Sequence, residues 1–425
     1  MTRDKLRVSV PSVEQLSSKP GSAQGSSRAL SIDVLRFVAI ALVIIHHGRD
    51  YWVDSLALPK AFSSAVMRGG WIGVDLFFVL SGYLVARLLF REYEKHGSIR
   101  VGRFLVRRGL KIYPAFYAFI GFTVAVSWFT NGSIPDRLWS ELLFLQSYFQ
   151  GLWGHTWSLA IEEHFYVGLP LFLCILMARN WRECSPLSRY PMWCAIACLV
   201  VLVLRCFAVF SDPEFQGIVH FKPTHLRVDA LIFGSLLAFL HTFKTQSFES
   251  FCSKYFWYML AAGIWLLIPA FLSKLRTDPF LYSLGFTQFY VASACIVSAV
   301  VVRGVPRNLV TTLMGKIGMH SYSIYLWHLV VLRWGVKWTS DLYGERLPPL
   351  LEISIYAIGS VLIGVLMSKL VEYPVVRLRD RLFPSAVDSR SKERLVDYEI
   401  PQTTSTKPAV EVARSSPSPV ESNTI

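Results

Sequence analysis

The sequence predicts an all-α polytopic membrane protein with about ten transmembrane helices. Of its 425 residues, 53% are hydrophobic, and the mean hydropathy of +0.42 is too high for a soluble protein of this size. Apolar segments long enough to cross a bilayer, which takes about 20 residues, recur along most of the chain. We expect membrane spans at residues 31–50, 72–92, 112–130, 157–178, 191–211, 228–244, 255–273, 283–302, 320–338 and 351–372.

Residues 1–30 and 383–425 are predicted to be disordered tails on either side of one transmembrane domain at 31–382. The first segment is rich in Ser, Gly, Gln and basic residues, and the second is rich in Ser, Thr, Pro and Glu. Neither has the hydrophobic periodicity needed to bury a core. The first segment also lacks the apolar stretch of a cleavable signal peptide, which predicts that the first helix is retained.

The distribution of basic residues predicts how the chain is oriented in the membrane. The formal net charge is +14, and many basic residues fall between the second and third expected spans: Arg87, Arg91, Lys95, Arg100, Arg103, Arg107, Arg108 and Lys111. Short loops rich in Lys and Arg remain on the cytoplasmic side. We therefore expect both tails in the cytoplasm and a multi-pass protein of the inner (plasma) membrane. Positive charge confined to membrane-flanking loops also argues against nucleic acid as a partner.

Two ionisable residues lie in the first span, where Arg36 and His47 are separated by ten mostly apolar residues. An eleven-residue step returns to within about 20° of the same helix face and advances by about 16 Å. Ionisable groups in a membrane helix are costly and usually face a polar cavity, so the pair marks a candidate functional site. The alternative is that Arg36 anchors the inner interface and His47 lies at the outer helix end.

The second and fourth spans add further candidates near their outer ends. Asp75 lies about one turn into the second span, where it could instead be a helix N-terminal charge favoured by the helix dipole. Ser81 and Gly82, near mid-membrane, permit close helix packing. Consecutive residues point about 100° apart, so at least one of the three ionisable residues at 162–164 must face a cavity.

The sixth, ninth and tenth spans also contain polar residues. Arg227 and Asp229 are too close in sequence to pair with each other, so each is expected to meet a partner on another helix, as a structural ion pair or in catalysis. His328 lies near mid-membrane with no assigned role, and Glu372 is expected to be a structural carboxylate at the inner end of its helix. The further candidate intramembrane polar residues are thus Asp33, Ser81, Arg227, Asp229, His328 and Glu372.

The seven cysteines are expected to be free thiols. They form no CxxC motif and no Cys/His cluster with metal-ligand spacing. No metal site is therefore predicted.

Seven motifs occur in an order that resembles the acyltransferase-3 family of integral membrane O-acyltransferases. They are DVLRFVAIALVIIHH at 33–47, GVDLFFVLSGYL at 73–84, RFLVRRGLKIYP at 103–114, TWSLAIEEHFY at 156–166, LRVDALIFG at 226–234, SYSIYLWH at 321–328 and EYP at 372–374. The resemblance covers about residues 31–382. The arginine and histidine of the family's first helix fall on Arg36 and His47, so His46 is only the neighbour of the motif histidine.

The resemblance implies transfer of an acyl group, most often acetyl, from cytoplasmic acyl-CoA to a hydroxyl of an extracytoplasmic carbohydrate. Such acceptors include polysaccharides, lipopolysaccharides and glycan precursors. Acyl-CoA would be a co-substrate, and no permanently bound cofactor is implied. One position departs from the family pattern, because Lys111 stands where an arginine is usual. Lysine keeps the charge but loses bidentate phosphate recognition.

Under this interpretation, the candidate residues divide into two groups. Arg36, Arg107, Arg108 and Lys111 are expected near the cytoplasmic face, where they would bind the CoA phosphates. His47 is expected nearer the outer face as the general base, with Glu162 as its orienting partner and Asp75 as a further catalytic carboxylate. Direct attack by the acceptor and an acyl-histidine intermediate both remain open.

Other interpretations of the intramembrane charges remain. A proton-coupled transporter or lipid-linked glycan flippase would also place Arg, His, Asp and Glu inside a helical bundle. A non-catalytic scaffold would explain burial but not the number of charges. Aromatic residues at the outer helix ends could stack on sugars, although an interfacial aromatic belt is the favoured explanation for Tyr51, Trp52, Trp71, Trp153 and Trp157.

Overall fold

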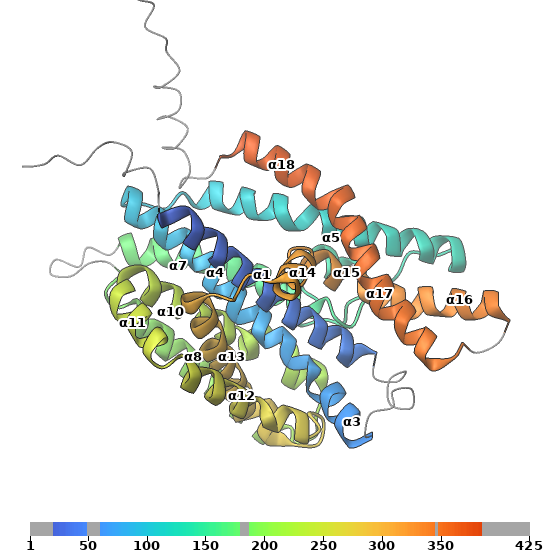
Figure 1. Cartoon of the computed structure of the whole chain (residues 1–425). Coiled ribbons are helices and arrows are strands. Elements are labelled where there is room, and N and C mark those ends of the chain that lie inside the picture. Colours follow the sequence, from blue (N-terminus) through green and yellow to red (C-terminus); the bar gives the residue numbers. More distant parts are fainter. Residues whose placement is uncertain (1–19, 49–59, 179–186, 345–346, 385–425) are drawn as a thin grey trace, which may run out of the picture. The chain divides into compact units, whose positions relative to one another are not determined.

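The computed structural model describes residues 20–48, 60–178, 187–344 and 347–384, and every regular element in these ranges is a helix (Figure 1). The first helix begins at Pro20, within the segment expected to be a tail. Most of both predicted tails, and Tyr51 and Trp52, lie outside the described residues. The helical unit ends at Phe383.

The described residues form a succession of helices and short helical turns. In chain order they are α1 (Pro20–His47), α3 (Lys60–Gly69), η2 (Gly70–Ile72), α4 (Gly73–His96), α5 (Val101–Asn131), α6 (Leu138–Leu142), α7 (Trp157–Ala178), α8 (Tyr190–Ser211), η3 (Gly217–Phe221), α9 (Thr224–Arg227), α10 (Asp229–Phe243), α11 (Thr245–Lys254), α12 (Phe256–Leu272), η4 (Leu281–Gly285), α13 (Phe286–Arg303), α14 (Leu309–Gly318), α15 (Ser321–Val330), η5 (Val331–Gly335), α16 (Val336–Tyr343), α17 (Pro349–Met367), η6 (Ser368–Glu372) and α18 (Tyr373–Leu382).

The prediction of an all-α polytopic membrane protein is confirmed. Within the described ranges, seven helices are long and apolar enough to cross a membrane, or eight if α11 and α12, bent by 75°, form one span. Three of the ten expected spans are not among these seven helices. The span expected at 228–244 is the 15-residue α10, that at 255–273 is the 17-residue α12, and that at 320–338 runs through α15, η5 and α16.

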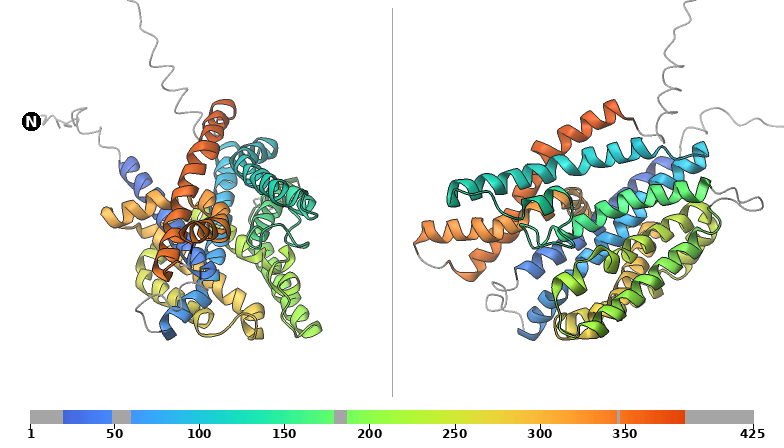
Figure 2. Two further views of the ribbon diagram at one scale, coloured as in Figure 1. Left: turned by 90° about the vertical axis from the view of Figure 1, so that its right-hand side faces the viewer. Right: turned by 180° about the vertical axis from the view of Figure 1, so that it is seen from behind.

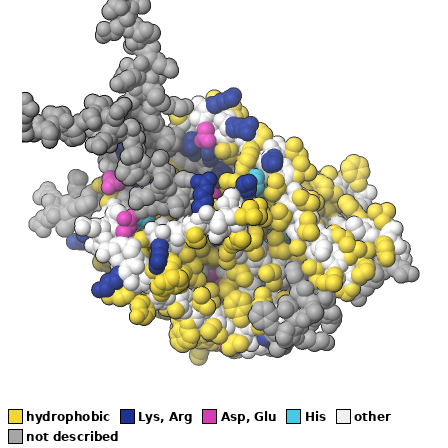
Figure 3. Space-filling view, viewed as in Figure 1, with side chains coloured by type: hydrophobic (Ala, Val, Ile, Leu, Met, Phe, Trp, Pro, Cys, Tyr) yellow, Lys and Arg dark blue, Asp and Glu magenta, His cyan; other side chains and the backbone are white. Residues whose placement is uncertain are grey.

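Large hydrophobic side chains cover much of the surface. Phe210 is 85% exposed and Trp257 is 68% exposed, a cost that a lipid environment removes. Figure 3 shows hydrophobic side chains over most of one face, with Lys and Arg side chains gathered toward the end that carries α18.

The basic segment expected as a loop is helical in the structure. Only residues 97–100 separate α4 from α5, so Arg103, Arg107, Arg108 and Lys111 lie on the first turns of α5. Arginine and lysine are good helix formers, which allows the apolar helix to extend backward through this segment. The N-terminal half of α5 runs beside α18 (Figure 2).

Close contact between α4 and α10 forms the centre of the helical unit. A Cβ on Gly82 would overlap the carbonyl oxygen of Leu231, and one on Gly234 would overlap that of Val79. Small residues allow helix backbones to approach in this way. The expected packing role of Gly82 is confirmed.

Two buried ion pairs fix the helices around this contact. Arg227 Nη2 lies 2.9 Å from Asp75 Oδ1, and Arg205 Nη1 lies 2.7 Å from Asp229 Oδ2. All four side chains are at most 1% exposed. The pairs link α4 to α9 and α8 to α10, so the expectation that Arg227 and Asp229 meet partners on other helices is confirmed.

Candidate active site: two adjoining pockets

A polar pocket lies between α1, α4, α5, α7, α15 and η6. We call it the basic pocket, because three cations from two helices line it: Arg36, Arg108 and Lys111. Three carboxylates, Glu162, Glu163 and Glu372, also line the pocket, as do Ser81 and Tyr325. Its empty space is about 840 Å³, including the part open to solvent.

One carboxylate of the basic pocket is held by neighbouring hydroxyl groups. Tyr166 donates a 2.5 Å hydrogen bond to Glu162 Oε2, and Ser81 donates one of 3.3 Å to Oε1. Tyr166 also lies under the Arg108 guanidinium, whose carbon is 4.0 Å from the ring centroid. Glu162 is therefore oriented within the basic pocket, by residues of α4 and α7.

The other two carboxylates are also hydrogen-bonded. Tyr113 donates to Glu163 Oε2 over 3.1 Å. Glu372 Oε2 accepts from Ser323 over 2.9 Å and from Ser368 over 3.1 Å. Glu372 ends the π-helical segment η6, and such wide turns are frequent at functional sites. Glu372 is thus held by two serine hydroxyls and also lines the pocket.

Two cations of the basic pocket make no ion pair within the described parts of the chain. Arg36 Nη1 lies 3.2 Å from Asp33 Oδ1 on the preceding turn of α1. Arg108 stacks on an aromatic ring, and Lys111 has no carboxylate within ion-pair distance among the described residues. Both can therefore meet an anionic ligand without first breaking a salt bridge.

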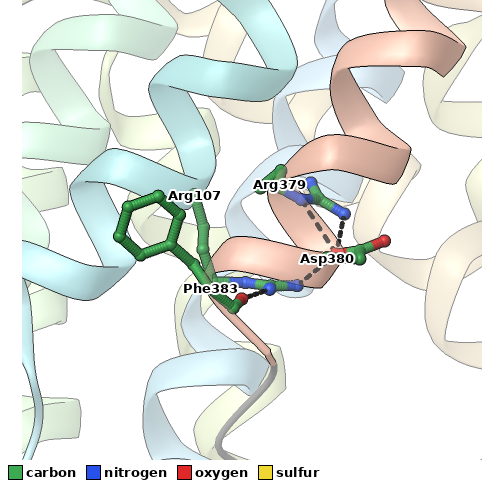
Figure 4. A network of polar contacts seen from close by, with 4 residues as sticks. All are labelled: Arg107, Arg379, Asp380 and Phe383. Atoms are coloured by element: carbon green, nitrogen blue, oxygen red, sulfur yellow. Dashed lines mark hydrogen bonds and ion pairs between the residues drawn. The ribbon is translucent and has the colours of Figure 1, made fainter.

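Arg107, expected to act beside Arg108, belongs to a different contact. Its guanidinium donates to Asp380 Oδ1 over 3.0 Å and to the carbonyl oxygen of Phe383. Arg379 donates to the same Asp380 oxygen over 2.8 Å (Figure 4). Consecutive residues of a helix point about 100° apart, so Arg108 faces the basic pocket while Arg107 binds α18. Arg107 is therefore not among the residues that line the basic pocket.

A second pocket lies at the other end of α1. We call it the histidine pocket, because His46, His47 and His155 line it. Its empty space is about 1,680 Å³, counted out to the opening. The two pockets share two lining residues, Val74 and Tyr325. They therefore adjoin, with the Tyr325 ring and the Val74 side chain at the boundary.

The histidines form a connected group in which the proton positions can be assigned. His47 Nδ1 lies 2.9 Å from the carbonyl oxygen of Val43 and 3.4 Å from His328 Nε2. His328 Nδ1 lies 2.7 Å from the carbonyl oxygen of Tyr325. A carbonyl oxygen only accepts, so Nδ1 carries the proton in both neutral rings. The lone pair of His47 is then on Nε2, which suits this nitrogen to remove a proton.

His155 is a member of this group that the sequence reasoning did not select. Its ring lies 5.0 Å from that of His328, centroid to centroid, and its Nε2 donates to the carbonyl oxygen of Leu326 over 3.2 Å. Burial lowers the pKa of His155 to about 3. Its place directly before TWSLAIEEHFY was the available signal, because that motif already carried candidate site residues.

The structure places two of the expected catalytic residues apart from His47. Glu162 faces the basic pocket with Tyr166, whereas His47 faces the histidine pocket beside His328. Glu162 therefore does not orient the His47 ring. Asp75 lies in the buried ion pair with Arg227 and lines neither pocket. Its charge is compensated inside the protein by Arg227.

The aromatic residues assigned to an interfacial belt are also placed differently. Trp71 is 4% exposed and Trp157 is 5% exposed, and both line the histidine pocket. Trp153 is 4% exposed, and Arg333 lies over its ring at 5.0 Å. A belt residue must reach the lipid interface, so burial excludes that explanation for these three.

Among the described residues, no group of His, Cys, Asp or Glu is arranged to hold a metal ion. The histidines instead contact carbonyl oxygens and one another.

A family model described as an acyltransferase domain matches residues 30–369 of the chain. A peptidoglycan O-acetyltransferase, OatA, from Listeria monocytogenes is 27% identical over 332 residues, which are 71% of this chain and 49% of the relative. A Staphylococcus aureus protein named "Putative O-acetyltransferase" is 27% identical over 326 residues, 71% of this chain and 50% of the relative. The chain thus spans about half the length of the curated relatives it matches. No solved structure matches it.

Proposed function

Because the chain belongs to the acyltransferase-3 family, we propose that it is an integral membrane O-acyltransferase that transfers an acyl group, in particular acetyl, from cytoplasmic acyl-CoA to a hydroxyl of an extracytoplasmic carbohydrate. The names of the relatives support acetyl transfer to a cell-envelope glycan. The observation that carries the proposal is the pair of adjoining pockets, one cationic and one lined by histidines.

The basic pocket is the proposed donor site. Arg36, Arg108 and Lys111 offer positive charge to the phosphates of CoA, and charge-assisted hydrogen bonds to phosphate are among the stronger polar contacts. The dense group of basic residues around the start of α5 supports a cytoplasmic position for this end of the bundle. Lys111 contributes as a point charge rather than a bidentate donor.

The shared boundary provides the route between the two faces. Arg36 and His47 are eleven residues apart on α1, which corresponds to about 16 Å along the helix axis. This distance is comparable to an extended pantetheine arm. A CoA held by the basic pocket would therefore present its thioester past Tyr325 and Val74, close to His47, while the nucleotide part stays on the cytoplasmic side.

The chemistry requires activation of a weak nucleophile. His47 Nε2 takes the proton of the acceptor hydroxyl as its oxygen attacks the thioester carbonyl, and the carbon–sulfur bond then breaks. The same proton passes from the imidazolium to the CoA sulfur, which leaves as the thiol. His328 accepts from His47 Nδ1 and so fixes the ring orientation and tautomer. In the alternative two-step mechanism, the acyl group is first transferred to His47 and then to the acceptor hydroxyl.

A proton-coupled transporter or glycan flippase is the second candidate, favoured by the same intramembrane charges. It would move its substrate without consuming acyl-CoA, so donor turnover separates the two functions.

Donor turnover by the purified full chain in lipid nanodiscs tests the proposal. With labelled acetyl-CoA and a mixture of cell-envelope glycans, we expect label on the glycan or on the protein, and at least a 100-fold slower rate for His47→Ala, because a positioned general base contributes about 10²–10⁴-fold. His225→Ala, at an exposed histidine outside both pockets, serves as the matched control. Unchanged transfer by a folded His47→Ala variant would exclude the assigned base, and no acetyl-CoA binding or turnover by the native chain would favour the transporter.

A further inference from the structure

The charge of the histidine pocket is unusual for its position. Four cations line it, Arg68, Lys222, Lys274 and Arg276, and no Asp or Glu is among its described lining residues. Extracytoplasmic loops are generally poor in Lys and Arg, and like charges gathered around one cavity repel each other. Such a cluster at the proposed extracytoplasmic end therefore calls for a compensating anion.

The described neighbours do not supply that anion. No ion pair joins any of the four cations to a carboxylate in the described ranges. Lys222 interacts electrostatically with the Glu141 carboxylate but forms no ion pair with it. Glu141 Oε1 already accepts hydrogen bonds from Leu152 N over 2.8 Å and from Thr156 Oγ1 over 2.8 Å. Lys274 and Arg276 are exposed at the rim.

Two buried polar atoms in the same pocket also have no partner among the described residues. Trp71 is 4% exposed and His155 is 1% exposed, and both line the pocket. The indole N–H of Trp71 can only donate a hydrogen bond, and His155 Nδ1 can only accept one because Nε2 holds the proton. A donor suits an anionic oxygen and an acceptor suits a hydroxyl.

Flat apolar surface completes the site. Trp157, Phe215 and Phe221 line the pocket beside the cations, and aromatic rings stack on the apolar faces of sugars. A ligand that satisfies cations, an N–H donor, a hydroxyl acceptor and aromatic faces together is a sugar that carries an oxyanion.

We propose that the acceptor is an anionic glycan, with a carboxylate or phosphate group bound by Arg68, Lys222, Lys274 and Arg276 while one of its hydroxyls faces His47. This inference rests on the proposed function, since it assigns the acceptor class to the same site. An anionic glycan would explain why four cations line the histidine pocket, and it would supply partners for Trp71 Nε1 and His155 Nδ1.

Equilibrium binding without donor tests the inference separately from catalysis. The full chain in phosphatidylcholine nanodiscs is titrated at low salt with an oligosaccharide of glucuronic acid and with its carboxyl-reduced counterpart. A second arm uses glucose 6-phosphate and glucose, which distinguishes a phosphate ligand from a carboxylate. We expect at least one acidic ligand to bind at least tenfold more tightly than its neutral counterpart, and the difference to diminish with added salt.

Variants locate the effect. An exposed charge pair at about 4 Å changes affinity by about fivefold, so Lys274→Gln/Arg276→Gln should weaken acidic binding by tenfold or more and leave neutral binding unchanged. Trp71→Phe keeps an aromatic side chain but removes the N–H, and it should also weaken acidic binding. Arg137→Gln, at an exposed arginine outside both pockets, is the matched control and should have no effect.

Three results would overturn the inference. Acidic and neutral ligands could bind equally, or the double variant could behave like the control. Alternatively, the double variant could lose affinity for added phosphatidylglycerol while oligosaccharide binding stays unchanged, in which case the cations serve the membrane surface. Transfer to neutral glycans alone would also overturn the inference but leave the proposed function standing, whereas acidic binding without any acetyl-CoA turnover would refute the proposed function and show an anionic ligand that is not an acyl acceptor.

Discussion

Replacing Asp75 with asparagine distinguishes a structural carboxylate from a catalytic one. Asp75 and Arg227 are each 1% exposed and lie 2.9 Å apart, and removing one member of a buried ion pair costs about 3–5 kcal/mol because the other charge is left uncompensated. At about 2 °C per kcal/mol for a chain of this size, the midpoint of thermal unfolding should fall by roughly 6–10 °C. Arg227→Gln should cost a similar amount.

The double variant Asp75→Asn/Arg227→Gln provides the internal control. It leaves neither charge uncompensated, so it should cost less than the sum of the two single variants, by an interaction free energy of about 1–3 kcal/mol. The assays are fluorescence-detected thermal unfolding in detergent and the transfer rate per folded molecule. If Asp75→Asn keeps the native unfolding midpoint but loses the transfer rate, Asp75 acts in the reaction and its structural assignment is wrong.

Three further predictions concern the donor pocket, the helix packing and the pH dependence. Arg108→Gln and Lys111→Gln should each raise the KM for acetyl-CoA about tenfold, because each removes one charge-assisted contact. Arg107→Gln should leave the KM unchanged. Steady-state kinetics measure these values, and equal effects of all three variants would contradict the pocket assignment. Gly82→Leu should prevent accumulation of folded protein because a side chain there overlaps the α10 backbone, which gel filtration measures; a normal monodisperse peak would refute the close contact. The pKa of His155 is about 3 in the folded protein and about 6.5 in the unfolded chain. At a pH between these two pKa values, unfolding takes up a proton. The free energy of unfolding should therefore fall as the pH drops from 6.5 toward 3, by at most about 1.4 kcal/mol per pH unit. Replacing His155 with glutamine should reduce this slope in unfolding midpoints measured against pH, and an unchanged slope would show that another group is responsible.

The fold class and several packing features could be predicted because they depend on local sequence. Apolar segments indicate membrane helices wherever they occur, and Gly82 in a membrane helix favours close packing. The number of spans was harder to predict. Hydropathy does not show that α11 and α12 are bent by 75° or that a π-helical segment interrupts the helix after Val330.

The sequence indicated several residues that line the two pockets, but not which of them contact one another. Arg36, Arg108, Lys111 and Glu162 line one pocket, and His47 lines the adjoining one. Which carboxylate meets which cation depends on helix rotation and on neighbours far away in the chain, information that a single sequence does not carry. The same limit explains other misplaced pairings, since Arg107 binds α18 and Asp75 binds a partner 152 residues away.

The central claim is that the donor stays on one face while the acceptor is modified on the other. The most direct test encloses acetyl-CoA inside liposomes that contain the protein in one orientation and supplies a membrane-impermeant glycan acceptor outside. Transfer of label to the outer glycan, with CoA retained inside and with the reaction abolished by His47→Ala, is the predicted result. Transfer only when donor and acceptor are on the same side would contradict the account.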